Sequence, residues 1–187
     1  MFVVEDVNEP AACVLRGVLE EVTCQNFTWN IVYAGKASSC SQKIHNLEFG
    51  IKQVKQSHSY VLCLDDDVEP HSSFLENLVA DLESMPEAHV ATAYPFDIPD
   101  GSAASLFTYA TLAYHLPLSV GLAINSQTRF VWGGCMAFRM IDMKADRLGI
   151  LQNWVNGGYS DDLTVAARMN KLGLHVYCPA YAVFPQW

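Results

Sequence analysis

The feature that most constrains the fold is a regular alternation of strand-like and helix-like segments along the 187 residues. The strand-like segments are 2–6, 29–35, 59–64, 89–94, 130–139 and 174–179, and the helix-like segments are 10–22, 41–54, 72–85 and 160–173. Alternation at such intervals is typical of βαβ units. The sequence therefore predicts one α/β domain covering 1–187, with an open, mostly parallel sheet and helices on both faces.

Two segments carry the more detailed expectations. The strand at 59–64 is apolar throughout, which is typical of a central parallel strand covered on both faces. In the helix at 72–85, the apolar spacing predicts one inward face. That face contains Phe74, Leu75, Leu78, Val79 and Leu82.

Charge and cysteine content narrow the functional class. The net charge is −9 and the isoelectric point is near 4.9, which argues against a nucleic-acid binder because such proteins need clustered Lys and Arg. Six cysteines lie at positions 13, 24, 40, 63, 135 and 178, without a CxxC pair or zinc-ligand spacing. Several of them lie within apolar runs, so we expect buried free thiols in a reducing compartment.

The segment 106–124 is apolar and has no formally charged residue, and it is nearly long enough to span a bilayer. His115 and Pro117 interrupt it. Three interpretations stay open: a buried helix broken at Pro117, a helix at a membrane interface, or a true membrane span.

Three consecutive aspartates, Asp65, Asp66 and Asp67, follow directly on the strand at 59–64. Ligands bind at this end of the strands in open α/β sheets. Side chains alternate along an extended segment, so Asp65 and Asp67 are expected on one face, as an oxygen-rich corner for Mg²⁺ or Mn²⁺. The alternative is a solvated loop in which Ser72 or Ser73 caps the next helix.

A second acidic pair, Asp161 and Asp162, opens the helix at 160–173. Acidic residues at this position complement the helix dipole and act as caps. The preceding Gly157 and Gly158 suggest a mobile loop that brings the helix start to another part of the molecule. A carboxylate there would then serve as general base if the fold carries it to the three aspartates.

Five motifs occur in a characteristic order: "VEDVNEPA", "GKASSCSQKIHNL", "VLCLDDDV", "VWGGCMAFR" and "GGYSDDLTVAARMNKLGLHVYCP". In this order and spacing the chain resembles the catalytic domain of processive-type GT-A glycosyltransferases, most closely the ceramide glucosyltransferase family. The resemblance runs through nearly the whole chain. It implies a GT-A fold and an inverting transfer of a sugar, glucose in that family, from a UDP-sugar to a lipid acceptor such as ceramide.

The resemblance also implies roles for the residues that contact the donor. Asp6 matches an aspartate near the uracil, and Lys43 and Asn46 match a Lys-x-x-Asn pair that contacts the nucleotide. Asp65 matches a second donor-binding aspartate, and together with Asp67 it matches a D-x-D motif that holds Mg²⁺ or Mn²⁺. From the residues alone, Lys43 is also compatible with a surface lysine.

For the chemical step, the resemblance implies that Asp162 is the catalytic base. Gly133, Gly134 and Cys135 match a stretch of small residues that lines the acceptor side. The two glycines alone are also compatible with a plain turn. The family further implies a membrane-associated protein whose catalytic domain lies on the cytosolic face.

The chain departs from the family at both ends. Relatives begin one strand earlier, and they carry a Gln-x-x-Arg-Trp motif and transmembrane helices beyond the region that ends here at Trp187. The expectation is therefore an N-terminally truncated catalytic core. Two rival functions stay open: an inactive or partner-dependent fragment, and a metal-dependent phosphohydrolase that uses the same carboxylates.

Overall fold

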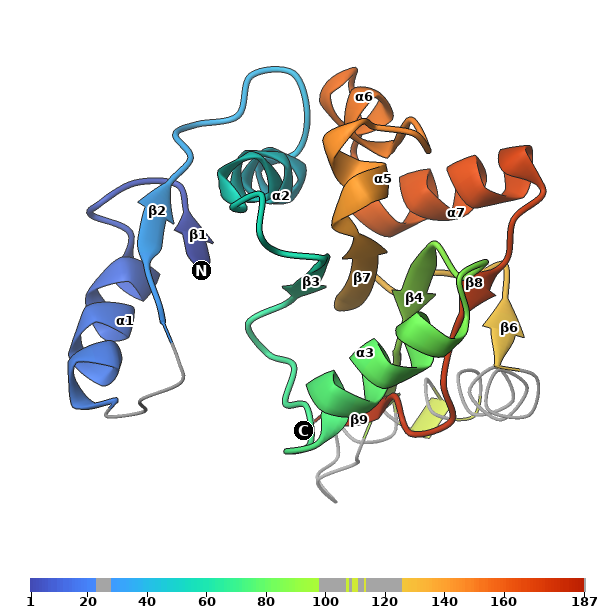
Figure 1. The fold of residues 1–187 in the computed structure, drawn as a ribbon. Coiled ribbons are helices and arrows are strands. Elements are labelled where there is room, and N and C mark those ends of the chain that lie inside the picture. The colour runs from blue at the N-terminus through green and yellow to red at the C-terminus, as the bar shows by residue number, and fades with distance from the viewer. Residues whose placement is uncertain (23–27, 98–106, 108, 111–112, 114–125, 187) are drawn as a thin grey trace.

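The computed structural model describes residues 1–22, 28–97, 107, 109–110, 113 and 126–186 (Figure 1). The strands in this part of the chain are β1 (Phe2–Val4), β2 (Ile31–Tyr33), β3 (Tyr60–Leu64), β4 (Val90–Thr92), β5 (Tyr94–Asp97), β6 (Gln127–Thr128), β7 (Cys135–Arg139), β8 (Val176–Tyr177) and β9 (Val183–Gln186). The helices are α1 (Pro10–Glu21), α2 (Gln42–Gln53), α3 (Phe74–Ser84), α5 (Met140–Lys144), α6 (Ile150–Val155) and α7 (Asp161–Leu172).

The described strands form three open sheets. The main sheet has five strands in the order β3-β7-β4-β8-β6, and the pairs β1-β2 and β5-β9 form two short parallel sheets. An α/β fold with an open sheet is therefore confirmed. The main sheet is mixed rather than mostly parallel, because β7 runs antiparallel to both of its neighbours and β6 runs antiparallel to β8.

The prediction for the strand at 59–64 was partly wrong. β3 forms as expected, but among the described strands it lies at the edge of the main sheet and pairs only with β7. Their antiparallel register joins Tyr60 to Arg139 and Leu64 to Cys135. Most of its residues are half-buried, and Leu64 is 40% exposed. An uninterrupted apolar run does not distinguish an edge strand from a central one when helices cover parts of both faces.

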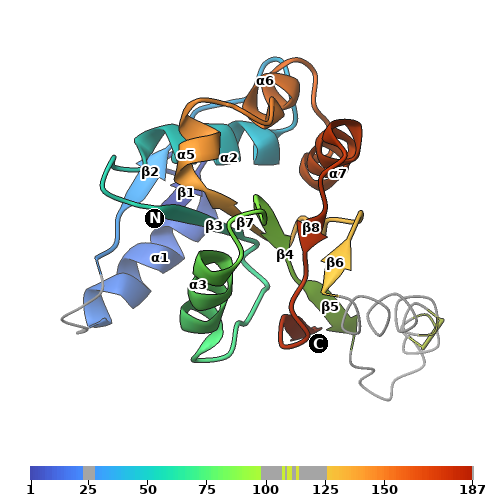
Figure 2. The same ribbon diagram turned by 45° about the vertical axis from the view of Figure 1, so that its right-hand side comes forward.

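Helices cover both faces of the main sheet, as predicted (Figure 2). Side chains alternate along β7, so Met136 and Phe138 point to one face while Cys135 and Ala137 point to the other. The first face packs against buried side chains of α2, α6 and α7, including Ile44, Trp154 and Val165. The second face packs against α3 through Phe74, Leu78 and Leu82. Full burial of such a side chain contributes roughly 1.5–3 kcal/mol relative to exposure.

Several local predictions can be compared with this arrangement. In α3, Phe74, Leu78 and Leu82 face inward as expected, but Leu75 is 57% exposed. Gly173 ends α7 in the left-handed region, with φ of +68°, as the sequence predicts. Ser73 precedes α3, but its side chain makes no capping hydrogen bond.

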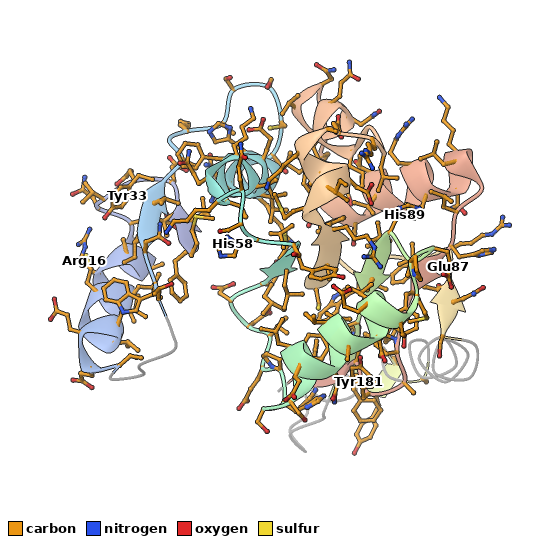
Figure 3. All side chains as sticks on the ribbon, in the orientation of Figure 1. Arg16, Tyr33, His58, Glu87, His89 and Tyr181 are labelled. Atoms are coloured by element: carbon orange, nitrogen blue, oxygen red, sulfur yellow. The ribbon has the colours of Figure 1, made fainter. Side chains whose placement is uncertain are left out.

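Tyrosine hydroxyl groups connect several elements (Figure 3). Arg16 of α1 donates to the hydroxyl of Tyr33 on β2 at 3.0 Å. Asp81 of α3 accepts hydrogen bonds from Tyr177 of β8 at 2.9 Å and from Tyr181 at 2.5 Å. These contacts attach α1 to the β1-β2 sheet and α3 to the main sheet.

Candidate functional site

The candidate site begins where β3 ends. The amide of Asp65 donates to the Gly134 carbonyl at 3.1 Å, which fixes the first aspartate against the segment before β7. The chain then turns, because the Val68 amide returns to the Asp65 carbonyl at 3.4 Å. Asp66 and Asp67 lie in this turn and are exposed. The alternation argument that put Asp65 and Asp67 on one face was therefore wrong in its premise, since it applies only to extended backbone.

Lys43 lies at the centre of the site. It is the second residue of α2, whose start is capped by the Ser41 side chain. Its Nζ atom is 2.8 Å from Asp65 Oδ1 and 2.9 Å from Asp65 Oδ2. The same atom is 3.1 Å from Asp161 Oδ2 and 3.3 Å from the Gly133 carbonyl oxygen. One ammonium group therefore joins residues from α2, the end of β3, the segment before β7 and the start of α7.

Asp161 was not among the predicted site residues. Its side chain is only 9% exposed, and its Oδ2 atom is buried without a well-oriented hydrogen bond from any described residue, although Lys43 lies within ion-pair distance. The Trp154 indole of α6 donates to the Asp161 backbone carbonyl at 3.0 Å. The fully buried Trp154 thus anchors the first residue of α7. The sequence indicated the acidic pair Asp161 and Asp162 at the start of a helix, and the motif match then selected Asp162 alone.

The charges in this cluster affect one another. Burial lowers the pKa of Lys43, but the hydrogen bond to Asp65 and the charge of Asp161 more than offset this, so the pKa lies above its ordinary value. Burial raises the pKa of Asp65, Lys43 opposes the rise, and the negative charges of Asp161 and Asp67 add to it. Two carboxylates, those of Asp161 and Asp67, therefore act on Asp65, while Lys43 is the cation in direct contact with it.

Gly133 is packed so closely that only glycine fits without a shift. A Cβ atom there would lie 3.0 Å from each carboxylate oxygen of Asp161 and 3.2 Å from Lys43 Nζ. At Gly134 a Cβ atom would lie 2.2 Å from the Trp132 ring. Cys135 is 1% exposed, and its side chain belongs to the core. Only its backbone could therefore line the predicted acceptor side.

Asp162 caps α7 and also reaches the site. Its Oδ1 atom accepts hydrogen bonds from the Ser160 hydroxyl and, at 2.6 Å, from the Leu163 amide. Its Oδ2 atom accepts the Gly133 amide at 3.3 Å. The sequence left open whether Asp162 caps the helix or lies near the three aspartates. In the structure one of its oxygens is used in capping, and the other faces the segment that contacts Lys43.

The loop before α7 is held in place by hydrogen bonds, in contrast to the mobile loop that the glycines suggested. The Ser41 amide donates to the Gly158 carbonyl, and the Gly158 amide donates to the Trp154 carbonyl, both at 3.0 Å. A Cβ atom at Gly158 would lie 2.6 Å from that same Trp154 oxygen. These contacts set the position of Asp161 and Asp162 relative to α2.

Asp6 and Asn46 lie near β1 and are not part of the Lys43 cluster. Asp6 follows β1, is exposed, and accepts the Asn8 amide at 2.6 Å. Asn46 donates to the Val3 carbonyl at 3.5 Å and accepts from Gln42 at 2.8 Å, which attaches α2 to β1. Their predicted contacts with the nucleotide stay a prediction.

The residues offer a divalent cation only part of its coordination shell. In the described parts of the chain, no group of three or more His, Cys, Asp or Glu side chains is arranged to hold a metal ion. Asp65 and the exposed Asp67 supply oxygen ligands, which Mg²⁺ and Mn²⁺ prefer. Mg²⁺ typically takes one or two carboxylates and fills its other positions with phosphate and water. Asp65 and Asp67 by themselves would leave most of the coordination shell of such an ion to phosphate and water.

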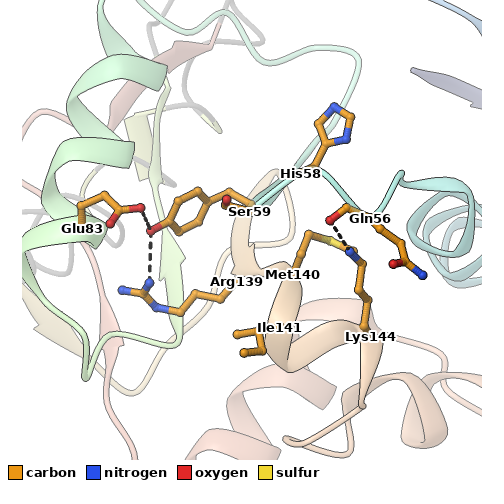
Figure 4. Close-up of a pocket in the computed structure, with 9 residues that line it drawn as sticks. Gln56, His58, Ser59, Glu83, Arg139, Met140, Ile141 and Lys144 are labelled. Carbon is orange, nitrogen blue, oxygen red and sulfur yellow. Dashed lines mark hydrogen bonds between the residues drawn. The ribbon is translucent and has the colours of Figure 1, made fainter.

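A separate pocket lies near the other end of β3 (Figure 4). It has a volume of about 380 Å³ and is lined by polar and apolar side chains. The Arg139 guanidinium in its wall donates to the Tyr60 hydroxyl at 3.1 Å and to the backbone carbonyl groups of Ala88 and Met85 at 3.0 Å each. These hydrogen bonds hold the Arg139 guanidinium against the end of α3, and Lys144 in the same lining donates to the Gln56 carbonyl at 3.1 Å.

The segment 106–124 falls almost wholly outside the described residues, so its three interpretations stay predictions. None of the helices in the described ranges has the combination of length and apolar character that crossing a bilayer requires. In comparisons with known proteins, no protein-family model matches the chain, and no curated protein matches it either.

Proposed function

We propose that the protein is an inverting glycosyltransferase of GT-A type, which transfers glucose from a UDP-sugar to a lipid acceptor such as ceramide. The observation that supports this most is the single network at the end of β3, in which Lys43 joins Asp65, Asp161 and Gly133, and Gly133 joins Asp162. Lys43 thereby contacts Asp65 at the start of the acidic turn directly, and Gly133 connects it to the candidate base Asp162.

The donor diphosphate would bind at the start of this network. Departure of UDP leaves negative charge on the diphosphate, and the Lys43 ammonium lies 41% exposed, where it can compensate part of that charge. Asp65 and Asp67 would hold Mg²⁺ or Mn²⁺ together with the phosphate oxygens. When bound, such an ion acts as a Lewis acid toward the leaving diphosphate.

The chemical step needs a base opposite the leaving group. In the proposal, Asp162 accepts the proton of the acceptor hydroxyl while that oxygen forms a bond to the anomeric carbon. The bond from the anomeric carbon to the diphosphate oxygen breaks, and UDP leaves with the electron pair. Attack opposite the leaving group inverts the configuration, and proton transfer of this kind supplies about 10²–10⁴-fold in rate.

The acceptor and the location of the protein belong to the same proposal. We infer that the protein is membrane-associated, with the catalytic domain on the cytosolic face, because a lipid acceptor is presented there. The apolar composition of 106–124 supports contact with a membrane or a lipid chain. Gly133 and Gly134 would lie on the acceptor side of the site.

Calorimetric titration of UDP into the purified chain, with and without Mg²⁺ or Mn²⁺, tests this function. We expect binding that requires the metal and that is lost in Asp67→Asn, because one charge and one ligand disappear at constant volume. Asp66→Asn is the matched control, since it removes the same charge from the same exposed turn. Unchanged metal-dependent affinity in Asp67→Asn would remove that residue from the site, and no UDP binding to the wild type would overturn the proposed function.

A further inference from the structure

The buried carboxylate of Asp161 has no role in the predicted site, although it is the most deeply buried acidic group there. Its side chain is 9% exposed, and its Oδ2 atom lies 3.1 Å from Lys43 Nζ without a well-oriented hydrogen bond from a described residue. A buried carboxylate is costly unless it is paired. The ion pair with Lys43 is therefore the contact that offsets the burial of this carboxylate.

Capping of α7 does not explain Asp161. The Leu163 amide, one of the free donors at the helix start, is already served by the side chains of Ser160 and Asp162. The helix dipole favours an acidic residue here, but that effect does not require burial. The contacts of the Asp161 carboxylate point instead to Lys43 and to Gly133, where a Cβ atom would lie 3.0 Å from both of its oxygens.

We propose that Asp161 is a positioning residue that holds the Lys43 ammonium beside Asp65, so that the diphosphate of a nucleotide donor meets a cation already in place. This rests on the proposed function for the identity of the ligand. Lys43 is a long and flexible side chain, and fixing it before the ligand arrives lowers the ordering cost at binding. Trp154 holds the Asp161 backbone, so the position of the carboxylate is itself set by the core.

The sign of the mutational effect distinguishes positioning from simple electrostatics. A carboxylate that merely stands near the phosphate site repels the ligand, so Asp161→Asn would then tighten UDP binding. If Asp161 instead positions Lys43, the same change weakens UDP binding by about tenfold, the loss expected when one charge-assisted hydrogen bond is misplaced. The substitution conserves shape and removes only the charge.

The first measurement is the UDP dissociation constant in a double-mutant cycle of Asp161→Asn and Lys43→Met. We expect the two losses to be non-additive, with Asp161→Asn changing the affinity by less than about twofold once Lys43 is absent. Additive losses, or tighter binding in Asp161→Asn, would overturn the proposal. Denaturation by urea of each variant shows separately whether the fold is retained.

The second measurement does not depend on UDP. Brief acetylation with acetic anhydride, followed by peptide mass spectrometry, reports how accessible and mobile each lysine amine is. We expect Asp161→Asn to raise the labelling of Lys43 several-fold, on the order of fivefold, with the exposed Lys36 as internal reference. Asp162→Asn is the matched control, because it removes the neighbouring charge from a side chain that bonds Gly133, Ser160 and Leu163.

The two measurements separate the possible failures. If the wild type does not bind UDP but Asp161→Asn frees Lys43 for labelling, the nucleotide ligand is wrong while the positioning contact is real. If Lys43 is labelled equally in the wild type and in Asp161→Asn, the proposal fails whatever UDP does.

A glycine substitution provides an independent test of the same contact. Gly133→Ala inserts a Cβ atom against the Asp161 carboxylate and Lys43, so we expect it to reproduce both the raised labelling and the weakened UDP binding. Gly17→Ala is the control, because nothing lies within 4 Å of its Cβ position. A Gly133→Ala protein with unchanged labelling and affinity would contradict the close packing on which the proposal rests.

Discussion

The two ends of β3 each carry a cation among polar groups, but the two cations are used differently. At the amino end, the Arg139 guanidinium donates to the Tyr60 hydroxyl and to the backbone carbonyl groups of Leu82, Met85 and Ala88. These carbonyl groups lie at and just beyond the end of α3, where a positive charge is favourable. At the carboxyl end, Lys43 contacts two carboxylates and one carbonyl group.

The two ends differ in which partners of the cation a ligand could replace. The partners of Arg139 are mostly backbone carbonyl groups, which cannot move away without unfolding the end of α3. The partners of Lys43 are mainly side-chain carboxylates, one of which carries a buried oxygen without a well-oriented donor. A satisfied network stabilises the fold, whereas a partly satisfied one near solvent is more typical of a ligand site. The comparison therefore favours a structural role for Arg139, and it supports the proposal that a ligand binds at the Lys43 end.

The largest expected effect concerns chemistry at the Lys43 end. Asp162→Asn should lower turnover of a UDP-sugar by about 10²–10⁴-fold while UDP affinity stays within about threefold, because a general base acts in the chemical step. The assay is sugar transfer to a lipid acceptor in detergent micelles, with Asp66→Asn as the charge-matched control. If donor affinity fell as far as turnover, Asp162 would instead be a binding or structural residue.

The next effect concerns stability at the Arg139 end. Arg139→Met should lower the free energy of unfolding by about 3 kcal/mol, since it leaves several part-buried acceptors without their charge-assisted donor. Urea denaturation measures this. Arg147→Met is the control: its contact with Asp142 is 3.9 Å long and its side chain is 57% exposed, so a change within about 0.5 kcal/mol is expected.

The same variant tests the division of roles between the two ends. UDP affinity of folded Arg139→Met protein should equal that of the wild type. A large loss of affinity with little loss of stability would reverse the comparison, because the arginine would then belong to a ligand site.

The smallest effect concerns Cys63, which lies on β3 between the two ends. Burial raises its pKa to about 12, so at pH 8 only about one thiol in ten thousand is a reactive thiolate. Alkylation with iodoacetamide, followed by mass spectrometry, should modify the exposed Cys13 well before Cys63. Rapid alkylation of Cys63 in the wild type would show that β3 opens from the sheet and that neither end is rigid.

The sequence predicted the helices better than the sheet, for a physical reason. Helix starts and ends depend on local signals, and α2 and α7 begin and end within one residue of the predicted ranges 41–54 and 160–173. The buried free thiols at Cys63, Cys135 and Cys178 were also expected, and the five described cysteines are all free. The direction of β7 is set by its pairing with β3 and β4, which are distant in the sequence, and no local pattern encodes that pairing.

The candidate site was likewise predicted where local motifs were enough, and missed where the position depends on distant packing. The motif order brought out Lys43, Asp65 and Asp162, and the structure brings all three into one network with Gly133. The prediction that Asp65 and Asp67 share one face assumed extended backbone, but the chain turns directly after Asp65. Asp161 was missed because local sequence cannot tell which residue of an Asp-Asp pair faces Lys43. That choice depends on the packing of α6 against α7 through Trp154.

The central claim is that the Lys43 end of β3 binds a nucleoside diphosphate and the Arg139 end does not. A titration of UDP and Mg²⁺ into ¹⁵N-labelled protein, followed by ¹H–¹⁵N correlation spectra, tests it most directly. We predict saturable, metal-dependent shifts of the Asp65 and Gly133 amides, with the Arg139 Nε–H signal unchanged. Shifts confined to Arg139 and Tyr60, or no saturable shift at Asp65 and Gly133, would contradict the claim.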